Sequence, residues 1–333
     1  MKKGLLALAL AAVTLGGASA QADGSFKGKT VRIIVGYGPG GGYDTYARML
    51  APHFAKKLDT TVIVENQPGA GGLNALNRLY AGKPDGVTMM LVNGTAAALS
   101  QLAGMKAVRY DLGKMGSLGT VAKSPWIWLV HKDYPIKTAQ EALDSGKEIR
   151  WAAGGLIDGL GDGARFTCAA LKLKCNVVIG YKGSNDASRA VMQGEMDALY
   201  VSDTSAFNYS KTGNVRAIAV MNRKPSRFFP NVKPIYDQVK LTKDGEWLLD
   251  FHSTVEDLGR ILVVAPNTPA KELKALQDAT KAVLTDKDVV AQGEKGRRYI
   301  EFVDAETTLK NIKTVVDVTP QEKERIRKVL HLN

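Results

Sequence analysis

The feature that most constrains this chain is a regular alternation of short apolar runs with amphipathic segments, which begins at Val31. The run VRIIVGY is followed by a helical pattern in YDTYARMLAPHFAKKL, and then by TVIVEN, GLNALNRLYAG and VTMMLVNG. Continuous apolar strands separated by amphipathic helices are typical of a parallel sheet that helices cover on both faces. The pattern therefore predicts an α/β fold.

A second unit of the same kind follows Ser124 and Pro125. The segments WIWLVHKD, IRWAAGG, VVIGY, DALYVSD and VRAIAV read as strands with helical segments between them, whereas residues 222–257 show no clear pattern. RILVVAPNTP and KELKALQDATKAVL then read as a strand and a helix. We expect two lobes joined by crossing strands, each with a central, mostly parallel sheet: residues 24–124 with 266–333, and residues 125–265. Ligands of such sheets bind beyond the carboxyl ends of the strands, so a cleft between the lobes is expected.

The first twenty residues, MKKGLLALALAAVTLGGASA, have the pattern of a signal peptide. Two lysines precede an apolar core that closes on small residues, which predicts cleavage near Ala20 and export to the periplasm. The core is shorter than the roughly 20 apolar residues that a membrane span needs. In an oxidising compartment Cys168 and Cys175 can form a disulfide, but their spacing alone leaves open whether they do.

The formal net charge of +12 favours an acidic ligand or partner. The basic residues are scattered along the chain and form no stripe with interleaved aromatic residues. We therefore expect no nucleic-acid interface.

The first glycine-rich loop, GYGPGGGYD, lies between a predicted strand and a predicted helix. Gly36, Gly38 and Gly41 match the dinucleotide fingerprint, but Pro39 stiffens the loop and nicotinamide cofactors are not normally supplied outside the cytoplasm. We expect no cofactor. Glycines let backbone amides approach an anion, and a helix start offers unpaired N–H groups, so a carboxylate suits this loop as well as a phosphate does.

A second glycine-rich loop, ENQPGAGGLNAL, follows the second predicted strand. Gly69, Gly71 and Gly72 again precede a helix, and Asn66 adds an amide that can donate and accept. Two such loops on adjacent strands are expected to face one ligand.

These motifs, followed in order by KPDGVTMML, YKGSNDASRAVMQGEMDALYVSD and VVAPNTPAKELKAL, resemble the solute-binding proteins of tripartite tricarboxylate transporters, the Bug family. The resemblance covers nearly the whole mature chain. It implies a two-lobed, type II-like periplasmic binding protein fold that closes on a small organic acid. It also implies a monomer without enzymatic activity that delivers the acid to a two-subunit integral membrane permease. The resemblance leaves open which organic acid is bound.

The same resemblance implies a set of ligand contacts that follow the strands of both lobes. In the first lobe these are Gly40, Gly41, Gly42, Tyr43, Asp44, Asn66, Ala70, Gly71, Gly72, Gly94 and Thr95. In the second lobe they are Gly154, Gly155, Tyr181 and Asp203. For Asp44, capping of the first helix by its own side chain is an equally good interpretation.

The loop GGLIDGLGDG departs from the family pattern, because Asp158 and Asp162 stand where many members have small hydroxyl residues. A calcium loop needs more oxygen ligands than this segment offers, so no metal site is expected. The better interpretation is that one of the two caps a helix beginning at Gly163. Arg260 could hold a ligand acid with its guanidinium, although a surface salt bridge is its more ordinary role.

Two aromatic pairs could line a binding site for an aromatic ligand or simply pack between the lobes: Tyr43 with Tyr46, and Trp126 with Trp128. The four histidines are isolated, and no GxSxG elbow is present. We therefore predict no catalytic residues, while a secreted hydrolase or isomerase and a sensing module for a membrane kinase stay open as alternatives.

Overall fold

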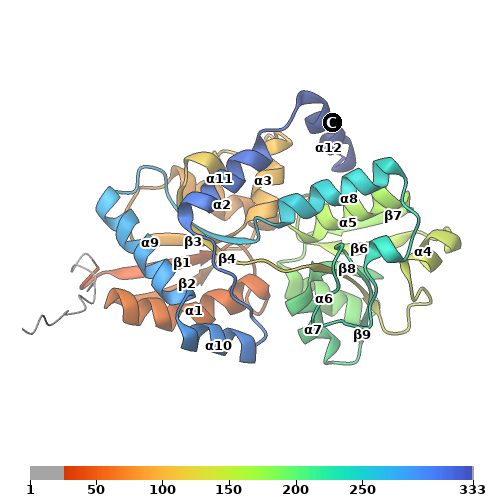
Figure 1. Ribbon diagram of the computed structural model, residues 1–333, viewed down its shortest axis with the longest axis horizontal. Coiled ribbons are helices and arrows are strands. Elements are labelled where there is room, and N and C mark those ends of the chain that lie inside the picture. The colour runs from red at the N-terminus through yellow and green to blue at the C-terminus, as the bar shows by residue number, and fades with distance from the viewer. Residues whose placement is uncertain (1–25, 332–333) are drawn as a thin grey trace, which may run out of the picture.

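The computed structural model describes residues 26–331. The predicted signal peptide, residues 1–20, lies outside this range. Two α/β lobes lie side by side, each built on its own five-stranded sheet, which confirms the predicted fold class (Figure 1). Within residues 26–331, no helix combines the length and apolar character that crossing a membrane requires.

The first lobe has the strand order β2-β1-β3-β10-β4. The strands are β1 (Thr30–Val35), β2 (Thr61–Asn66), β3 (Thr88–Asn93), β4 (Gly116–Ala122) and β10 (Arg260–Val264). Strand β1 pairs in parallel with β2 and β3, whereas β10 runs antiparallel between β3 and β4. The sheet is therefore more mixed than the apolar runs suggested.

Helices cover both faces of this sheet (Figure 1). One face carries α1 (Gly42–Leu58), α9 (Ala270–Leu284) and α10 (Lys287–Lys295), and the other carries α2 (Leu73–Ala81), α3 (Gly94–Leu102) and α11 (Ala305–Val316). Helix α1 buries Tyr46, Leu50, Phe54 and Leu58, which recur every four residues and so share one face. This apolar face packs α1 against the sheet.

The second lobe repeats the arrangement with the order β7-β6-β8-β5-β9. Its strands are β5 (Trp126–His131), β6 (Ile149–Ala153), β7 (Cys175–Ile179), β8 (Ala198–Ser202) and β9 (Val215–Val220). Its helices are α4 (Ala139–Ser145), α5 (Leu160–Leu171), α6 (Ser184–Met192), α7 (Asp203–Ser210) and α8 (Lys243–Glu256). Here β5 is the antiparallel strand, lying between β8 and β9.

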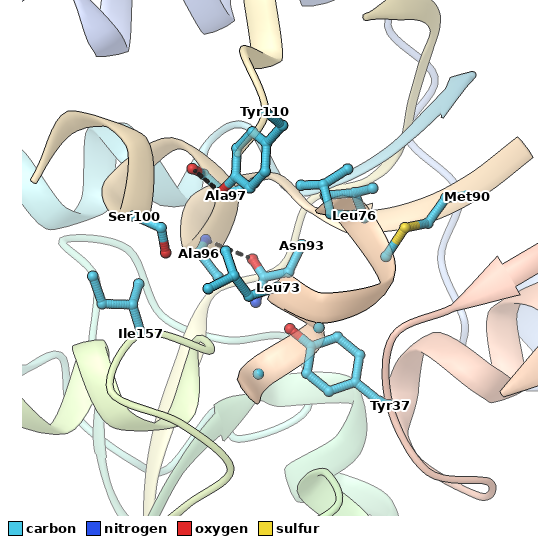
Figure 2. Close-up of a pocket in the computed structure, with 13 residues that line it drawn as sticks. Tyr37, Leu73, Leu76, Met90, Asn93, Ala96, Ala97, Ser100, Tyr110 and Ile157 are labelled. Atoms are coloured by element: carbon cyan, nitrogen blue, oxygen red, sulfur yellow. Dashed lines mark hydrogen bonds between the residues drawn. The ribbon is translucent and has the colours of Figure 1, made fainter. Parts of the chain in front are cut away.

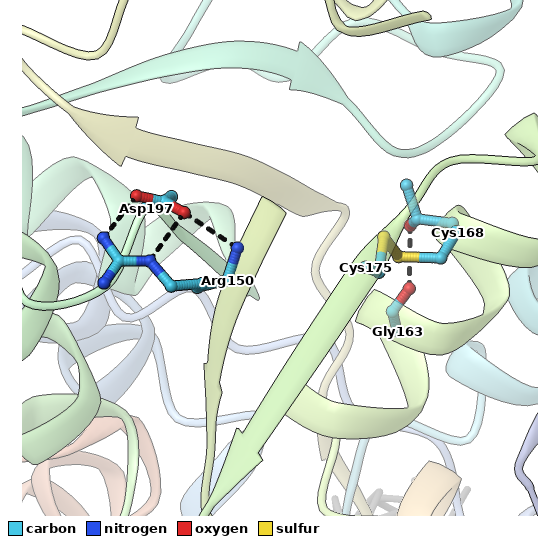
Figure 3. The surroundings of a disulfide bond; sticks show 6 residues. Arg150, Gly163, Cys168, Cys175 and Asp197 are labelled. Atoms are coloured by element: carbon cyan, nitrogen blue, oxygen red, sulfur yellow. Dashed lines mark hydrogen bonds and ion pairs between the residues drawn. A yellow bond between two sulfur atoms is a disulfide. The ribbon is translucent and has the colours of Figure 1, made fainter. Parts of the chain in front are cut away.

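A disulfide joins Cys168, in the last turn of α5, to Cys175 at the first position of β7 (Figure 3). It closes the short link between this helix and the strand that follows. The end of α5 is thus tied to the edge of the second sheet.

The chain crosses between the lobes at residues 123–125, between β4 and β5, and again at 257–259, between α8 and β10. Because β10 belongs to the first sheet, the chain returns to the first lobe before residue 260 and not at the predicted 266. Helix α8 lies in the segment that showed no sequence pattern, and it packs on α5. The last helix, α12 (Pro320–Val329), also packs on α5, and Arg325 stacks on Trp247 of α8. The C-terminal helix therefore lies against elements of the second lobe (Figure 1).

Candidate ligand-binding site

A cavity of about 30 Å³ lies between the two lobes. The first lobe lines it with Tyr37, Gly41, Gly42, Tyr43 and Arg260, and the second lobe with Trp126, Asp158, Leu160, Ser184, Val201, Ser202 and Ser205. Three of the predicted contacts, Gly41, Gly42 and Tyr43, thus meet at this cavity with residues of the other lobe.

Three helices begin at the cavity wall without a side-chain cap. The N-cap residues are Gly41 for α1, Gly183 for α6 and Ser202 for α7, and none of them accepts a capping hydrogen bond with its side chain. The first N–H groups of a helix have no partner inside the helix, and the helix dipole places partial positive charge there. Three uncapped starts around one space favour a negatively charged ligand.

Arg260 adds a full positive charge to this wall. Its side chain is buried, with the residue only 4% exposed, and it lies over the rings of Tyr43 and Tyr46 at 5.1 and 4.8 Å from their centroids. Its Nη2 donates to Ser202 Oγ at 3.1 Å and its Nη1 to Ser124 Oγ at 3.5 Å, while its buried Nε has no hydrogen-bond partner.

Within residues 26–331, no carboxylate forms an ion pair with Arg260. The surface salt bridge suggested by the sequence is therefore wrong, because the insertion of β10 between β3 and β4 places Arg260 inside the molecule. A buried guanidinium without an anionic partner is unfavourable. A ligand carboxylate would supply that partner, with the paired geometry that guanidinium groups favour.

Asp44 and Asn66 hold the first glycine-rich loop in place and do not line the cavity. The carboxylate of Asp44 accepts from the Gly40 amide, from Arg48 Nε and from Asn66 Nδ2, each at 2.9 Å. Burial alone would raise the pKa of Asp44, but the hydrogen bonds from Arg48, Gly40 and Asn66 outweigh it and lower the pKa. Asp44 is thus an ionised brace for the loop that presents Gly41 and Gly42.

The second glycine-rich loop packs directly against the other lobe. A Cβ placed on Gly71 would lie only 2.5 Å from Cβ of Asp158, and one on Gly155 would lie 3.1 Å from the Gly71 nitrogen. Gly71 also has a φ of 65°, which favours glycine. Ala70 and Gly154 belong to the same two touching loops, so this part of the gap is filled by protein.

Gly71 and Gly72 line a second, smaller cavity of about 20 Å³ beneath α2 and α3. Figure 2 shows Tyr37, Leu73, Leu76 and Ile157 around it, and its polar atoms are already engaged in part, because Asn93 Oδ1 caps α3 and the Tyr110 hydroxyl donates to the Ala97 carbonyl. This cavity is largely apolar and lacks a cationic side chain in its described lining.

Gly94 and Thr95, which were also predicted to contact the ligand, do not line the cavity and instead bond to other parts of the protein. The Gly94 amide donates to the Gly259 carbonyl at 2.9 Å, and Thr95 Oγ1 donates to the Val255 carbonyl at 3.2 Å. Gly94 therefore fastens the start of α3 to the crossing at 257–259, and Thr95 fastens it to the end of α8.

In the second lobe, Tyr181 and Asp203 lie outside the cavity wall. Tyr181 is partly buried, and its amide donates to the Ala153 carbonyl at 3.2 Å. Asp203 accepts from Ser226 Oγ at 3.0 Å, and burial raises its pKa to about 6. Asp203, the first residue of α7, lines a separate, wide groove to which residues 123–125 and 257 of the crossings also contribute.

The start of α5 carries its own carboxylates. Asp158 accepts from the amides of Gly154 and Gly161 at 2.6 Å and of Leu160 at 3.1 Å, and Asp162 accepts from the Asp158 amide at 2.9 Å and from the Gly159 amide. Capping by these aspartates is confirmed, although the helix begins at Leu160 and not at Gly163. Burial and the neighbouring Asp162 raise the pKa of Asp158 to about 7.

Behind this start lies a buried network that the sequence did not reveal. His252 Nε2 lies 3.1 Å from Asp162 Oδ2, His252 Nδ1 lies 3.3 Å from Glu256 Oε1, and the Tyr200 hydroxyl donates to Glu256 at 2.6 Å. Burial raises the pKa of Glu256 to about 8. Since both ring nitrogens face carboxylates, His252 has no nitrogen left to activate a serine hydroxyl.

No group of three or more His, Cys, Asp or Glu side chains in the described part of the chain is arranged to hold a metal ion. Of the aromatic residues considered from the sequence, Tyr43 and Trp126 line the cavity, whereas Tyr46 lies under Arg260. Trp128 packs in the core with its ring 5.0 Å from that of Trp151.

Sequence reasoning missed the serines of the cavity wall: Ser184, Ser202 and Ser205. Ser202 and Ser205 follow β8 in the segment SDTSAF, at the carboxyl end of a strand. The expectation that ligands bind at such ends was enough to single them out.

Comparisons with known proteins agree with this architecture. The model of the family described as tripartite tricarboxylate transporter family receptor matches residues 46–313. The UPF0065 protein in the gbd 5′ region of Cupriavidus necator is 32% identical over 235 residues, which cover 68% of each chain. The periplasmic binding protein BugD shares the fold with a TM-score of 0.75 at 21% identity, over 90% of this chain and 97% of BugD. MatC from Rhodopseudomonas palustris with bound malate has a TM-score of 0.73 at 22% identity, over 90% and 98% of the two chains.

Proposed function

The chain belongs to the tripartite tricarboxylate transporter receptor family, and from this premise we propose that it is a periplasmic receptor for a small organic acid. The acid is held through a carboxylate in the cavity between the lobes and is then delivered to a two-subunit integral membrane permease. The protein binds its ligand without turning it over.

Arg260 is the observation that carries this proposal. Its guanidinium is buried in the cavity wall without a carboxylate partner, among the uncapped starts of α1, α6 and α7. A carboxylate bound there gains charge-assisted hydrogen bonds from Arg260 and from backbone amides. The similarly folded MatC structure holds malate, which is an organic acid.

Contacts between the lobes support closure around the ligand. The Gly38 amide donates to the Lys182 carbonyl at 2.6 Å, and the Tyr37 hydroxyl donates to the Asp158 carbonyl at 3.3 Å. Arg298 donates to Thr45 of α1 and to the Thr204 carbonyl of α7, at 2.9 and 3.2 Å. A ligand that contacts both lobes favours this closed arrangement over an open one.

A thermal-shift screen against a panel of small organic acids tests the binding function. An acid present at about 100 times its dissociation constant adds about 2.7 kcal/mol to the free energy of unfolding, and the melting temperature rises accordingly. The Arg260→Gln protein serves as the control and should show no such rise. If no acid in the panel stabilises the wild-type protein, the proposed function is contradicted.

Delivery to a permease is tested separately from binding. Membrane vesicles that contain the two permease subunits should accumulate the labelled acid only when the receptor is added. Uptake that is unchanged by the receptor, together with tight binding in solution, would instead favour a sensing role.

A further inference from the structure

The gap between the lobes contains a second place where a helix start faces the other lobe, and the chain fills it with its own carboxylates. At the start of α5, the Asp158 carboxylate accepts hydrogen bonds from the amides of Gly154, Leu160 and Gly161. The Asp162 carboxylate accepts hydrogen bonds from the amides of Asp158 and Gly159. These are the unpaired N–H groups that would otherwise hold an anion. An external carboxylate finds no free donor among them.

The space in front of this helix start is also closed. A Cβ on Gly71 would lie 2.5 Å from Cβ of Asp158 and 2.8 Å from the Ile157 carbonyl oxygen, so the second glycine-rich loop touches the α5 loop. The Asp158 carbonyl accepts from the Tyr37 hydroxyl and from Asn93 Nδ2, at 3.3 and 3.1 Å. A ligand cannot extend into this region without separating the two loops.

The cavity itself offers charge compensation for one carboxylate. Among the described residues that line it, Arg260 is the single cationic side chain, and Asp158 is acidic. Trp126, Leu160 and Val201 supply apolar wall. A second ligand carboxylate would lie against apolar side chains or beside Asp158, and a buried charge in either place is strongly unfavourable.

We infer that the ligand carries a single carboxylate on a short uncharged body, and that Asp158 is the residue that excludes a second carboxylate. This inference rests on the proposed function and narrows it to a substrate class.

Matched acids of equal chain length test the inference by isothermal titration calorimetry at about pH 8, where carboxylic acids in solution are ionised. Butanoate is compared with butanedioate, and pentanoate with pentanedioate. We expect each monocarboxylate to bind the wild-type protein at least about 100-fold more tightly than the matching dicarboxylate.

The variant Asp158→Ser removes the carboxylate and frees the amides of Gly154 and Gly161. The affinity ratio of each monocarboxylate to its matching dicarboxylate should fall about 10-fold relative to the wild type. Asp278→Ser is the control, because Asp278 lies on the surface of α9, where it pairs with Lys274. It should change neither affinity. If Asp158→Ser does not fold, the wild-type comparison alone decides.

The outcomes separate this inference from the proposed function. Butanedioate binding to the wild type as tightly as butanoate, with loss of that binding in Arg260→Gln, overturns the inference and leaves the receptor function standing. If no acid of either class binds, both fail.

Discussion

The start of α5 and the starts of α1, α6 and α7 border the same gap between the lobes, but their N–H groups have different partners. At α5, Asp158 and Asp162 accept five backbone hydrogen bonds. At the other three helices no side chain caps the start, and a buried arginine lies beside them. The comparison teaches that a helix start in this gap is available to a ligand only where the protein's own side chains do not cap it.

The rest of the molecule follows the α5 pattern. Helices α3, α4, α8, α10, α11 and α12 each begin with a side chain that accepts a capping hydrogen bond. The chain thus uses caps freely where a helix start has no ligand to hold. The uncapped starts at the cavity therefore stand out, although α2 and α9 also lack a side-chain cap.

The largest expected effect comes from removing the positive charge of Arg260, which lies beside the uncapped starts of α1, α6 and α7. Arg260→Gln should weaken binding of the acid by about 100-fold or more, because the ligand carboxylate loses its charged donor. The same variant should unfold at an equal or higher urea concentration without ligand, since a buried unpaired charge is removed. Calorimetry and urea unfolding measure the two effects. The control Arg150→Gln breaks an exposed ion pair with Asp197 and should leave the affinity unchanged (Figure 3). Unchanged affinity in Arg260→Gln would remove the basis of the comparison.

Substitution of the carboxylates that cap α5 is expected to lower the stability of the fold. Asp162→Asn should lower the free energy of unfolding by about 3 kcal/mol, because two buried amides and His252 lose their charged acceptor. Asp304→Asn, at the exposed cap of α11, provides the matched control, with an expected loss well below about 1 kcal/mol, because asparagine caps a helix about as well as aspartate does. Chemical unfolding of both variants measures the difference. A loss in Asp162→Asn no larger than in Asp304→Asn would show that the buried carboxylates of α5 stabilise the fold no more than an ordinary exposed cap does.

A smaller effect is expected from adding a side chain at Gly42, where α1 begins at the cavity. A Cβ on Gly42 would lie 2.9 Å from Ser205 Oγ and 3.4 Å from Arg260 Nη2, so Gly42→Ala should hinder closure and weaken binding about 10-fold. Gly113→Ala is the control, since a Cβ there would meet only one side-chain oxygen, at 3.4 Å. Titration calorimetry on both proteins makes the comparison. Equal affinities would mean that the start of α1 does not contact the ligand.

The last expected effect is a dependence of stability on pH, which comes from the buried carboxyls of Asp158 and Glu256. Burial raises the pKa of Asp158 to about 7 and that of Glu256 to about 8. The folded protein therefore binds more protons than the unfolded chain, so stability should rise as the pH falls from about 8 to about 6, by about 1 to 2 kcal/mol for each of the two groups. Urea unfolding across this range measures the slope, and Glu256→Gln should flatten it. A rise in stability with pH in this window would contradict the assigned pKa shifts.

Much of the fold was predictable because its strands are short apolar runs. The strands β1 to β3 and β5 to β10 agree with runs visible in the sequence. Helix α8 could not be predicted in this way. Its buried face includes the polar residues His252 and Glu256 beside Leu248 and Leu249, so its apolar residues do not recur at the regular spacing of a helix. The antiparallel insertion of β10 was also hidden, since pairing partners are not encoded in the strand's own composition.

The site was predictable only in part for the same reason. The first glycine-rich loop does line the cavity, but an arginine at the start of a strand reads as a surface residue. Its burial depends on β10 lying between β3 and β4. The second glycine-rich loop was expected beside the ligand, yet it contacts Asp158, because that aspartate and its loop occupy the space in front of it.

Arg260 lies directly after the crossing at 257–259, and Ser124 of the other crossing is 3.5 Å from its Nη1. The guanidinium therefore sits beside the axis about which the lobes would rotate, and points near a rotation axis travel little. An acid could meet Arg260 before the two halves come together, while the wider swing of α6 toward α1 would follow. Capture and enclosure would then be successive events, with the charge recognised first and the shape second.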